Sequence, residues 1–502
     1  MADSERGLDA VATEAISAAV LQRALDLGVS HAEIRLEALR HQYVGLRDGV
    51  LETAADDAGL GVAVRVVAEG AIGFAATVDL SVEACVALVD TAVDAARRTG
   101  ALAIGPIELA PEPAHGNHVW NGGERIDPTT VSLADKVALL EAWSAIVLGS
   151  DGVEHVQAFV GTTAEDKYYA DTGGTTARQH RVWVHPAVEA LSIDSATGEF
   201  ETMRTVAPPV GRGWEYLLGE QWNFEAELAE LAGHLAEKMA SPTIEPGRYD
   251  LVIDPTNLWL TIHESIGHAT ELDRALGYEA AYAGTSFATF DKLNALRYGS
   301  ELMNVTGDRT TPFGLATIGI DDEGVAAQSF DLVRDGILVG YQLDRKIAAE
   351  VGFGRSNGCA YASSPLMTPI QRMANVSLAP APGEGPSLDD LISGVERGIY
   401  IVGDKSWSID MQRYNFQFTG QRFFRIEHGK LAGQVRDVAY QATTTDFWGS
   451  LSRLGGASTY LLGGAVNCGK GQPGQTAPVS HGCPVALFEQ INILNTKSEA
   501  GR

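Results

Sequence analysis

Two histidines and a glutamate lie close together in residues 261–268, which read TIHESIGH. His263 and His268 flank Glu264 in the pattern H-E-x-x-x-H. Neutral imidazoles are good zinc ligands, and zinc lowers the pKa of a bound water to about 7. A carboxylate beside the first ligand can take the proton of that water and pass it to a leaving amine. The residue types therefore indicate a hydrolytic zinc site with Glu264 as general base.

The spacing of the two histidines makes a sharp structural prediction. In an ideal α-helix, residues four apart lie about 40° apart around the axis, and residues five apart about 140°. His263 and His268 are five apart, so a regular helix would not aim both rings at one ion. We therefore expect a π-type bulge between them, where Gly267 could tolerate the distortion. The alternative is a partly buried helix whose histidines bind only their neighbours.

A third protein ligand must come from elsewhere, with one position left open for water. The candidates are Cys468, Cys483, His481, Glu271 and Asp273. Small residues flank Cys468 and would let its backbone approach a metal, and Lys470 nearby would favour the thiolate. Glu271 is too close to His268 on the same helix to complete a tetrahedron.

The elements that must position these residues fall into two predicted domains, 1–245 and 246–502, in an α+β fold. The sequence of the first half predicts helices over 8–28, 82–98, 131–148 and 223–240. It predicts strands over 32–38 and 42–47, a hairpin of 60–67 and 71–78, strand-like structure over 153–200 and a connecting loop over 105–128. Pro246-Gly247 marks the boundary. The second half predicts mainly antiparallel strands and one helix, 256–276, that carries the histidines.

The composition limits the class of protein. The chain has 502 residues and a formal net charge of −28, which disfavours nucleic acid and acidic membrane surfaces as partners. We find no secretory signal and no apolar run of about 18 residues, the length of a membrane span. Four cysteines are too sparse for a disulfide framework. A cytoplasmic location is expected.

These motifs resemble those of the TldD/PmbA peptidases, specifically the metal-bearing TldD-like branch, over nearly the whole chain. The matching stretches are 263–276 (HESIGHATELDRAL), 321–340, 372–375, 398–400 and 466–472 (VNCGKGQ). The PmbA-like branch lacks the histidine motif. The resemblance implies zinc held by His263, His268 and Cys468, with Glu264 as base.

The resemblance also implies a β-rich C-terminal domain and pairing with a second copy or with a PmbA/TldE-like subunit, so that a cavity encloses the site. The implied substrates are extended or unfolded peptides, with leader-peptide trimming or degradation of small proteins as roles. An alternative is a non-catalytic, peptide-binding or chaperone-like subunit with a structural metal. A closed site with four ligands would favour that alternative.

Other residues are open to two interpretations. Arg372 and Asn375 could bind the backbone of an extended peptide, or could belong to a surface loop. Trp407 could line a peptide groove, although packing over a sheet edge is favoured. Residues 321–324 (DDEG) lack the alternating ligands of a calcium loop, which favours a solvated turn.

Overall fold

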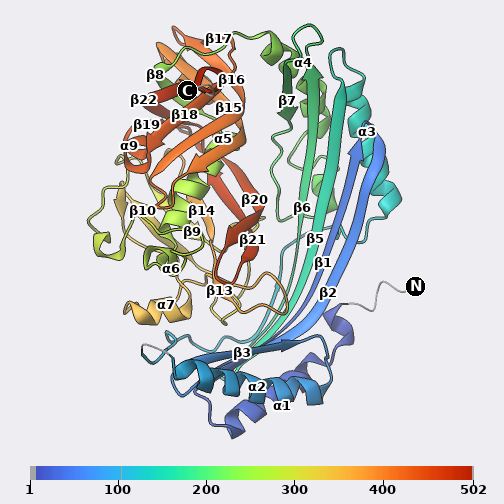
Figure 1. The fold of residues 1–502 in the computed structure, drawn as a ribbon, viewed down its shortest axis with the longest axis vertical. Coiled ribbons are helices and arrows are strands. Elements are labelled where there is room, and N and C mark those ends of the chain that lie inside the picture. The colour runs from blue at the N-terminus through green and yellow to red at the C-terminus, as the bar shows by residue number, and fades with distance from the viewer. Residues whose placement is uncertain (1–6, 103–104, 500–502) are drawn as a thin grey trace.

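The computed structural model describes residues 7–102 and 105–499. It is a mixed α+β structure in which long strands of the first half arch beside a β-rich second half (Figure 1). This confirms the predicted fold class. The proposed boundary between residues 245 and 246 falls between the last helix of the first half and the first strand of the second. Among the described residues, no helix has the length and apolar character that crossing a membrane requires.

The first half is built on one curved sheet, with strand order β3-β2-β1-β5-β6-β4 and β7 paired to β6. Its strands are β1 (His31–Arg47), β2 (Val50–Ala68), β3 (Ala71–Thr77), β4 (Gly116–Asn121), β5 (His155–Asp171), β6 (Thr175–Ile193) and β7 (Phe200–Arg204). All pairings are antiparallel except β4 with β6. The strand β4 lies in the segment predicted as a loop. The sequence does not indicate a strand there, because this short, largely exposed stretch carries little apolar alternation.

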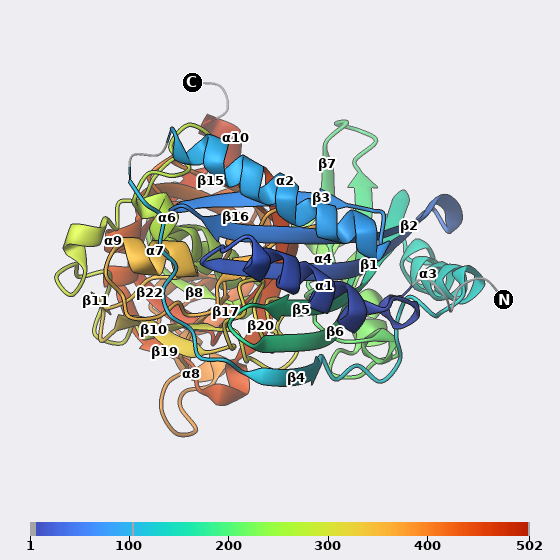
Figure 2. The same cartoon turned by 90° about the horizontal axis from the view of Figure 1, so that it is seen from below.

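Helices cover two parts of this sheet. They are α1 (Thr13–Asp26), α2 (Val82–Gly100), α3 (Leu133–Leu148) and α4 (Phe224–Ala240), close to the predicted ranges. Ser81 caps α2 by accepting a hydrogen bond from the Ala84 amide. The apolar faces of α1 and α2 form one core with β1 and β2, and α3 and α4 form another with β5 and β6. Figure 2 shows α1 and α2 lying across one end of the sheet.

The second half contains a ring of strands in the order β15-β8-β22-β18-β16, closed because β15 also pairs with β16. The ring and its two attached strands are β8 (Gly247–Ile253), β15 (Arg397–Ile409), β16 (Asn415–Glu427), β17 (Lys430–Gln434), β18 (Val438–Thr443), β19 (Leu451–Leu454) and β22 (Ala486–Asn495). Closure leaves few free strand edges and surrounds a large aromatic core. The helix α5 (Pro255–Ile262) follows β8 and packs Leu258 and Ile262 into that core.

Smaller elements complete the second half. The strands are β9 (Val305–Asp308), β10 (Ser329–Arg334), β11 (Ile337–Leu338), β12 (Ala360–Tyr361), β13 (Ile370–Gln371), β14 (Asn375–Leu378), β20 (Leu461–Lys470) and β21 (Gln475–Cys483). The helices are α6 (Leu272–Ala275), α7 (Arg345–Glu350), α8 (Leu388–Ser393), α9 (Thr444–Gly449) and α10 (Thr496–Glu499). The hairpin of β20 and β21 carries both candidate cysteines, Cys468 on β20 and Cys483 on β21.

Buried charges join the two halves, and here one prediction is wrong. Asp322 and Glu323 are 5% and 1% exposed and do not form a solvated turn. Lys167 of β5 lies 3.0 Å from an oxygen of Asp322, and Arg65 of β2 lies 2.6 Å from an oxygen of Glu323. The cations come from strands far away in the chain, so the local sequence could not indicate that these carboxylates are buried.

Candidate metal centre

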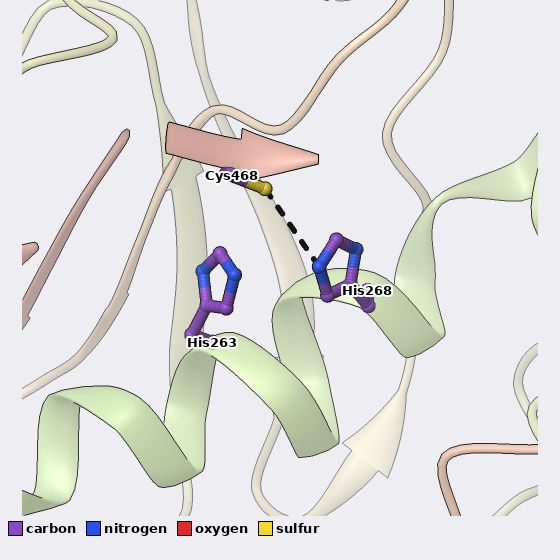
Figure 3. A group of neighbouring side chains, drawn as sticks. All are labelled: His263, His268 and Cys468. Atoms are coloured by element: carbon purple, nitrogen blue, oxygen red, sulfur yellow. Dashed lines mark hydrogen bonds between the residues drawn. The ribbon is translucent and has the colours of Figure 1, made fainter. Parts of the chain in front are cut away.

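Three side chains from two distant parts of the chain meet beside α5 (Figure 3). The ligand atoms of His263, His268 and Cys468 all lie within 4.8 Å of one another. The Sγ atom of Cys468 is 3.7 Å from Nε2 of His268. Tetrahedral zinc with bonds of 2.0 to 2.3 Å would separate a nitrogen from a sulfur by about 3.5 Å. The donor set and its spacing therefore fit a zinc ion.

The helix that carries the histidines is irregular where the spacing predicted. After α5, residues His263–Gly267 form a π-helical turn and His268–Thr270 a 3₁₀ turn. The predicted helix over 256–276 is therefore broken at Glu271, where the backbone is extended, and α6 starts at the next residue. The π turn spreads one turn over more residues, so residues five apart fall on one side, and the two imidazole ring centroids lie 4.7 Å apart.

Tertiary contacts stabilise this irregular turn. The hydroxyl of Tyr298 donates to the Ser265 carbonyl at 2.5 Å, and Nε2 of Gln342 donates to the Gly267 carbonyl at 2.7 Å. These donors satisfy carbonyl groups that a regular helix would pair internally. Gly267 has an ordinary helical φ of −52°, so the backbone itself does not require glycine there. The surrounding space favours glycine at this position, because an added Cβ would lie 2.5 Å from Sδ of Met373.

A histidine from β21 fixes the orientation of His263. Nδ1 of His481 lies 2.9 Å from the Val376 carbonyl, which can only accept, so Nδ1 carries the proton. Nε2 of His481 is then an acceptor, and it lies 2.7 Å from Nδ1 of His263. His263 consequently keeps its proton on Nδ1 and presents an unprotonated Nε2 to the metal site. His481, one of the candidate ligands, thus supports a ligand instead.

A carboxylate does the same for His268. Nδ1 of His268 donates to Oε2 of Glu271 at 2.8 Å, which leaves Nε2 free toward Cys468. The other oxygen of Glu271 lies 3.1 Å from Nζ of Lys470. Lys470 also donates to Oδ1 of Asp273 at 2.7 Å. Lys470 therefore binds carboxylates and does not face the Cys468 thiol, contrary to the expectation from sequence.

The protonation states of the three candidate ligands suit a metal. Burial lowers the pKa of His263 and of His268, so both rings are neutral near pH 7. Burial alone would raise the pKa of Cys468, but the His268 ring and the Arg372 guanidinium hold it below its usual value. Metal binding requires neutral imidazoles and a thiolate; burial favours the neutral rings, and the Arg372 guanidinium favours the thiolate against the effect of burial.

The other cysteines lie outside the described metal group. Cys483 is fully buried, and its Sγ donates to the Pro255 carbonyl at 3.8 Å. Cys85 is part of the core between α2 and the first sheet. Cys359 is buried, and burial raises its pKa to about 12.

Arg372 and Asn375 are buried, with exposures of 1% and 0%. Arg372 donates to the carbonyls of Cys468 and Gln475, so it holds the β20–β21 hairpin in place. Asn375 donates to the Asp308 carbonyl at 2.8 Å and accepts from the amides of Ala316 and Ser480. These contacts do not support the predicted role in binding substrate, and they replace the predicted surface loop with buried structural links.

The candidate metal site opens into a cleft of about 480 Å³ between the two halves. Glu264 lines this cleft beside the three candidate ligands, and Oε2 of Glu264 lies 2.5 Å from Nη1 of Arg413. Trp407 of β15 is 53% exposed and lines the cleft, so packing over a sheet edge was the wrong preference. Sequence reasoning missed Arg413 entirely, because no motif marks it.

The comparisons with known proteins identify the family of this chain. Residues 246–495 match the family model of the PmbA/TldA metallopeptidase C-terminal domain, and residues 32–96 match that of PmbA/TldA metallopeptidase domain 1. Fold and matches together define a metallopeptidase-type protein. The chain belongs to the TldD/PmbA family.

Individual relatives extend this result. A metalloprotease of Methanothermobacter thermautotrophicus is 27% identical over 473 residues, which cover 93% of this chain and 96% of that protein. A protein of Saccharolobus solfataricus named zinc metalloprotease TldD homolog is 26% identical and covers 53% of this chain and 56% of its own length. The crystal structure of TldE from Thermococcus kodakarensis shares the fold, with a TM-score of 0.68 at 16% identity, and covers 94% of this chain and 98% of that one.

Proposed function

We propose that this chain is a zinc-dependent peptidase of the TldD-like branch, acting on extended or unfolded peptides. One observation carries the proposal. His263 and His268 each bind a partner through Nδ1 and leave Nε2 free beside Cys468, on a cleft that also holds Glu264. Among the described residues, the group contains three ligands, which leaves a coordination position open as in catalytic sites.

The residues of the chain take separate parts in the proposed hydrolysis. When bound, zinc would act as a Lewis acid and lower the pKa of a water to about 7. His263, His268 and Cys468 would hold the ion. Oε1 of Glu264, the oxygen not bound to Arg413, would take the proton of the attacking water and deliver it to the amine that leaves. The cleft between the two halves would hold the peptide.

Metal analysis combined with one substitution tests this function. We expect about one zinc per chain, and hydrolysis of an unfolded peptide that a chelator abolishes and added zinc restores. Glu264→Gln should retain the zinc and lose activity by about 10²-fold or more, because a general base contributes about 10²–10⁴-fold. Full turnover by Glu264→Gln would reject its role. Stable peptide binding without turnover in the zinc-loaded chain would favour the non-catalytic, chaperone-like alternative.

We also propose a second subunit, either another copy or a PmbA/TldE-like chain, that encloses the cleft. The shared fold with TldE supports this proposal. Light scattering coupled to size exclusion should give the mass of a dimer for the chain alone or for a mixture with a TldE-like chain. Single-chain mass in both samples would reject it. Leader-peptide trimming, degradation of small proteins and a cytoplasmic location belong to the same proposal.

A further inference from the structure

Arg413 lies in the turn between β15 and β16 and is bound to the proposed base. Its Nη1 is 2.5 Å from Oε2 of Glu264, and its side chain is 13% exposed. Both residues line the cleft that contains the three candidate metal ligands. The hydrolysis proposed above gives this arginine no part.

The backbone of Arg413 is held in an unfavourable conformation. Its φ is +62°, in the left-handed region that residues other than glycine seldom adopt. Asp410 stabilises the turn, because its carboxylate accepts from the amides of Gln412, Tyr414 and Asn415. The hydroxyl of Thr444 donates to the Arg413 carbonyl at 2.7 Å. Such strain persists only where the surroundings enforce it, often at functional sites.

The Arg413 guanidinium has hydrogen-bond donors that no described residue accepts. Nε of Arg413 is buried without a hydrogen-bond partner. Among the described residues, Glu264 accepts the hydrogen bond that this side chain makes, from Nη1. Arginine carries five N–H donors, and a buried donor without an acceptor is destabilising. The unpaired donors therefore suit an acceptor that arrives with the substrate.

We propose that Arg413 donates a hydrogen bond to the carbonyl oxygen of the scissile peptide as that oxygen gains negative charge, with Glu264 aiming the guanidinium. This inference rests on the proposed peptidase function. The water oxygen bonds to the carbonyl carbon, and the carbonyl electron pair moves to the oxygen that Arg413 binds. The water proton passes to Oε1 of Glu264, then to the amine nitrogen as the C–N bond breaks. Arg413 changes neither its protonation nor its bonds.

The substitution Arg413→Gly tests this role without adding strain, because glycine adopts a φ of +62° freely. Removing a donor to a developing oxyanion costs about 10²–10³-fold in kcat. We expect that loss with a nearly unchanged KM and an unchanged zinc content in a chain that remains folded. Arg413→Lys should recover part of kcat, because it keeps the charge but not the planar fork.

A matched control separates this effect from the general loss of an arginine. Arg436 also has a mostly buried side chain, an Nε without a hydrogen bond and a carboxylate 3.1 Å away on Glu199, with Asp437 further off at 3.9 Å, but it lies outside the cleft. Arg436→Gln should leave kcat unchanged. A phosphinic peptide, whose tetrahedral oxygens mimic the charged state, should lose affinity for Arg413→Gly by the same factor as kcat/KM.

Two outcomes would overturn the inference. A rise in KM with unchanged kcat would make Arg413 a ground-state binding residue. Loss of zinc or of the folded state in Arg413→Gly, but not in Arg436→Gln, would make it structural. Either result, with Glu264→Gln inactive, leaves the peptidase proposal standing. An active Glu264→Gln would instead reject the mechanism on which both proposals rest.

Discussion

Nδ1 of His263 lies 2.7 Å from Nε2 of His481, a residue 218 positions further along the chain. The second histidine is fixed in turn by the Val376 carbonyl. The pair explains how a ring on an irregular helix can present one defined nitrogen to a metal. Burial lowers the pKa of His481 well below its usual value, so this ring stays neutral and can accept.

The His481–His263 contact predicts a specific loss of metal affinity. His481→Phe keeps a ring of similar shape beside Trp259 but removes the acceptor. Loss of such an orienting partner costs about 10–100-fold in metal affinity. Competition with a chromophoric chelator measures this. His428→Phe, at a side chain that is 84% exposed, is the control and should bind zinc like the unmodified chain. Equal affinities for both variants would show that His481 does not support the site.

The two buried cysteines of the last hairpin should behave differently. Cys468→Ser should lose most of the zinc, because Sγ of Cys468 lies 3.7 Å from Nε2 of His268. Cys483→Ser should keep it, since the Cys483 thiol faces the Pro255 carbonyl, to which a serine hydroxyl can also donate. Metal content per chain by mass spectrometry distinguishes them. The reverse pattern would transfer the ligand role to Cys483.

Lys470 should contribute strongly to stability. Its ammonium lies 2.7 Å from Asp273, 3.1 Å from Glu271 and 3.4 Å from Glu279, and its side chain is fully buried. In the methionine variant Lys470→Met, Glu271 and Glu279 would keep Arg274 as a neighbouring cation, whereas Asp273 would lose its ion pair with Lys470. Removing one partner from a buried ion pair costs about 3–5 kcal/mol.

Urea unfolding of zinc-free protein measures that cost without the contribution of metal binding. Lys430→Met, at an exposed lysine, should change the free energy of unfolding by less than about 0.5 kcal/mol. If Lys470→Met were equally mild, the buried cluster would not depend on this cation.

Glu37 predicts how stability depends on pH. Its oxygens are buried without hydrogen bonds, and burial raises its pKa to about 7 despite Arg35 at 3.3 Å and Lys167 at 4.0 Å. Between about pH 4.5 and 7 the folded carboxyl holds a proton that the unfolded one has lost. Protons therefore favour the folded state, and this residue lowers stability as pH rises through that window.

The variant Glu37→Gln should thus be more stable than the unmodified chain above pH 7, by about 3 kcal/mol. The difference should disappear below about pH 4.5, where the glutamate is protonated in both states. Urea unfolding from pH 4 to pH 8 checks this, with the exposed Glu52→Gln as control. A gain that is constant over the whole range would show that Glu37 does not titrate there.

Local rules let the sequence predict several parts of this protein. The five-residue spacing of His263 and His268 required an irregular helix, because the rotation per residue is a property of the backbone, and the π turn has that form. Apolar periodicity and the Ser81 cap gave the helices of the first half for the same local reason. The residue types in 261–268 also indicated the chemistry to expect, which is hydrolysis at a zinc site.

Only the tertiary structure decided which side chains meet. It made His481 and Glu271 supports for the ligands, buried Arg372 and Asn375 among backbone groups, and placed Arg413 against Glu264. These partners are brought together by the packing of distant strands and turns. Their contacts depend on long-range approach in three dimensions, for which spacing along the chain carries no signal.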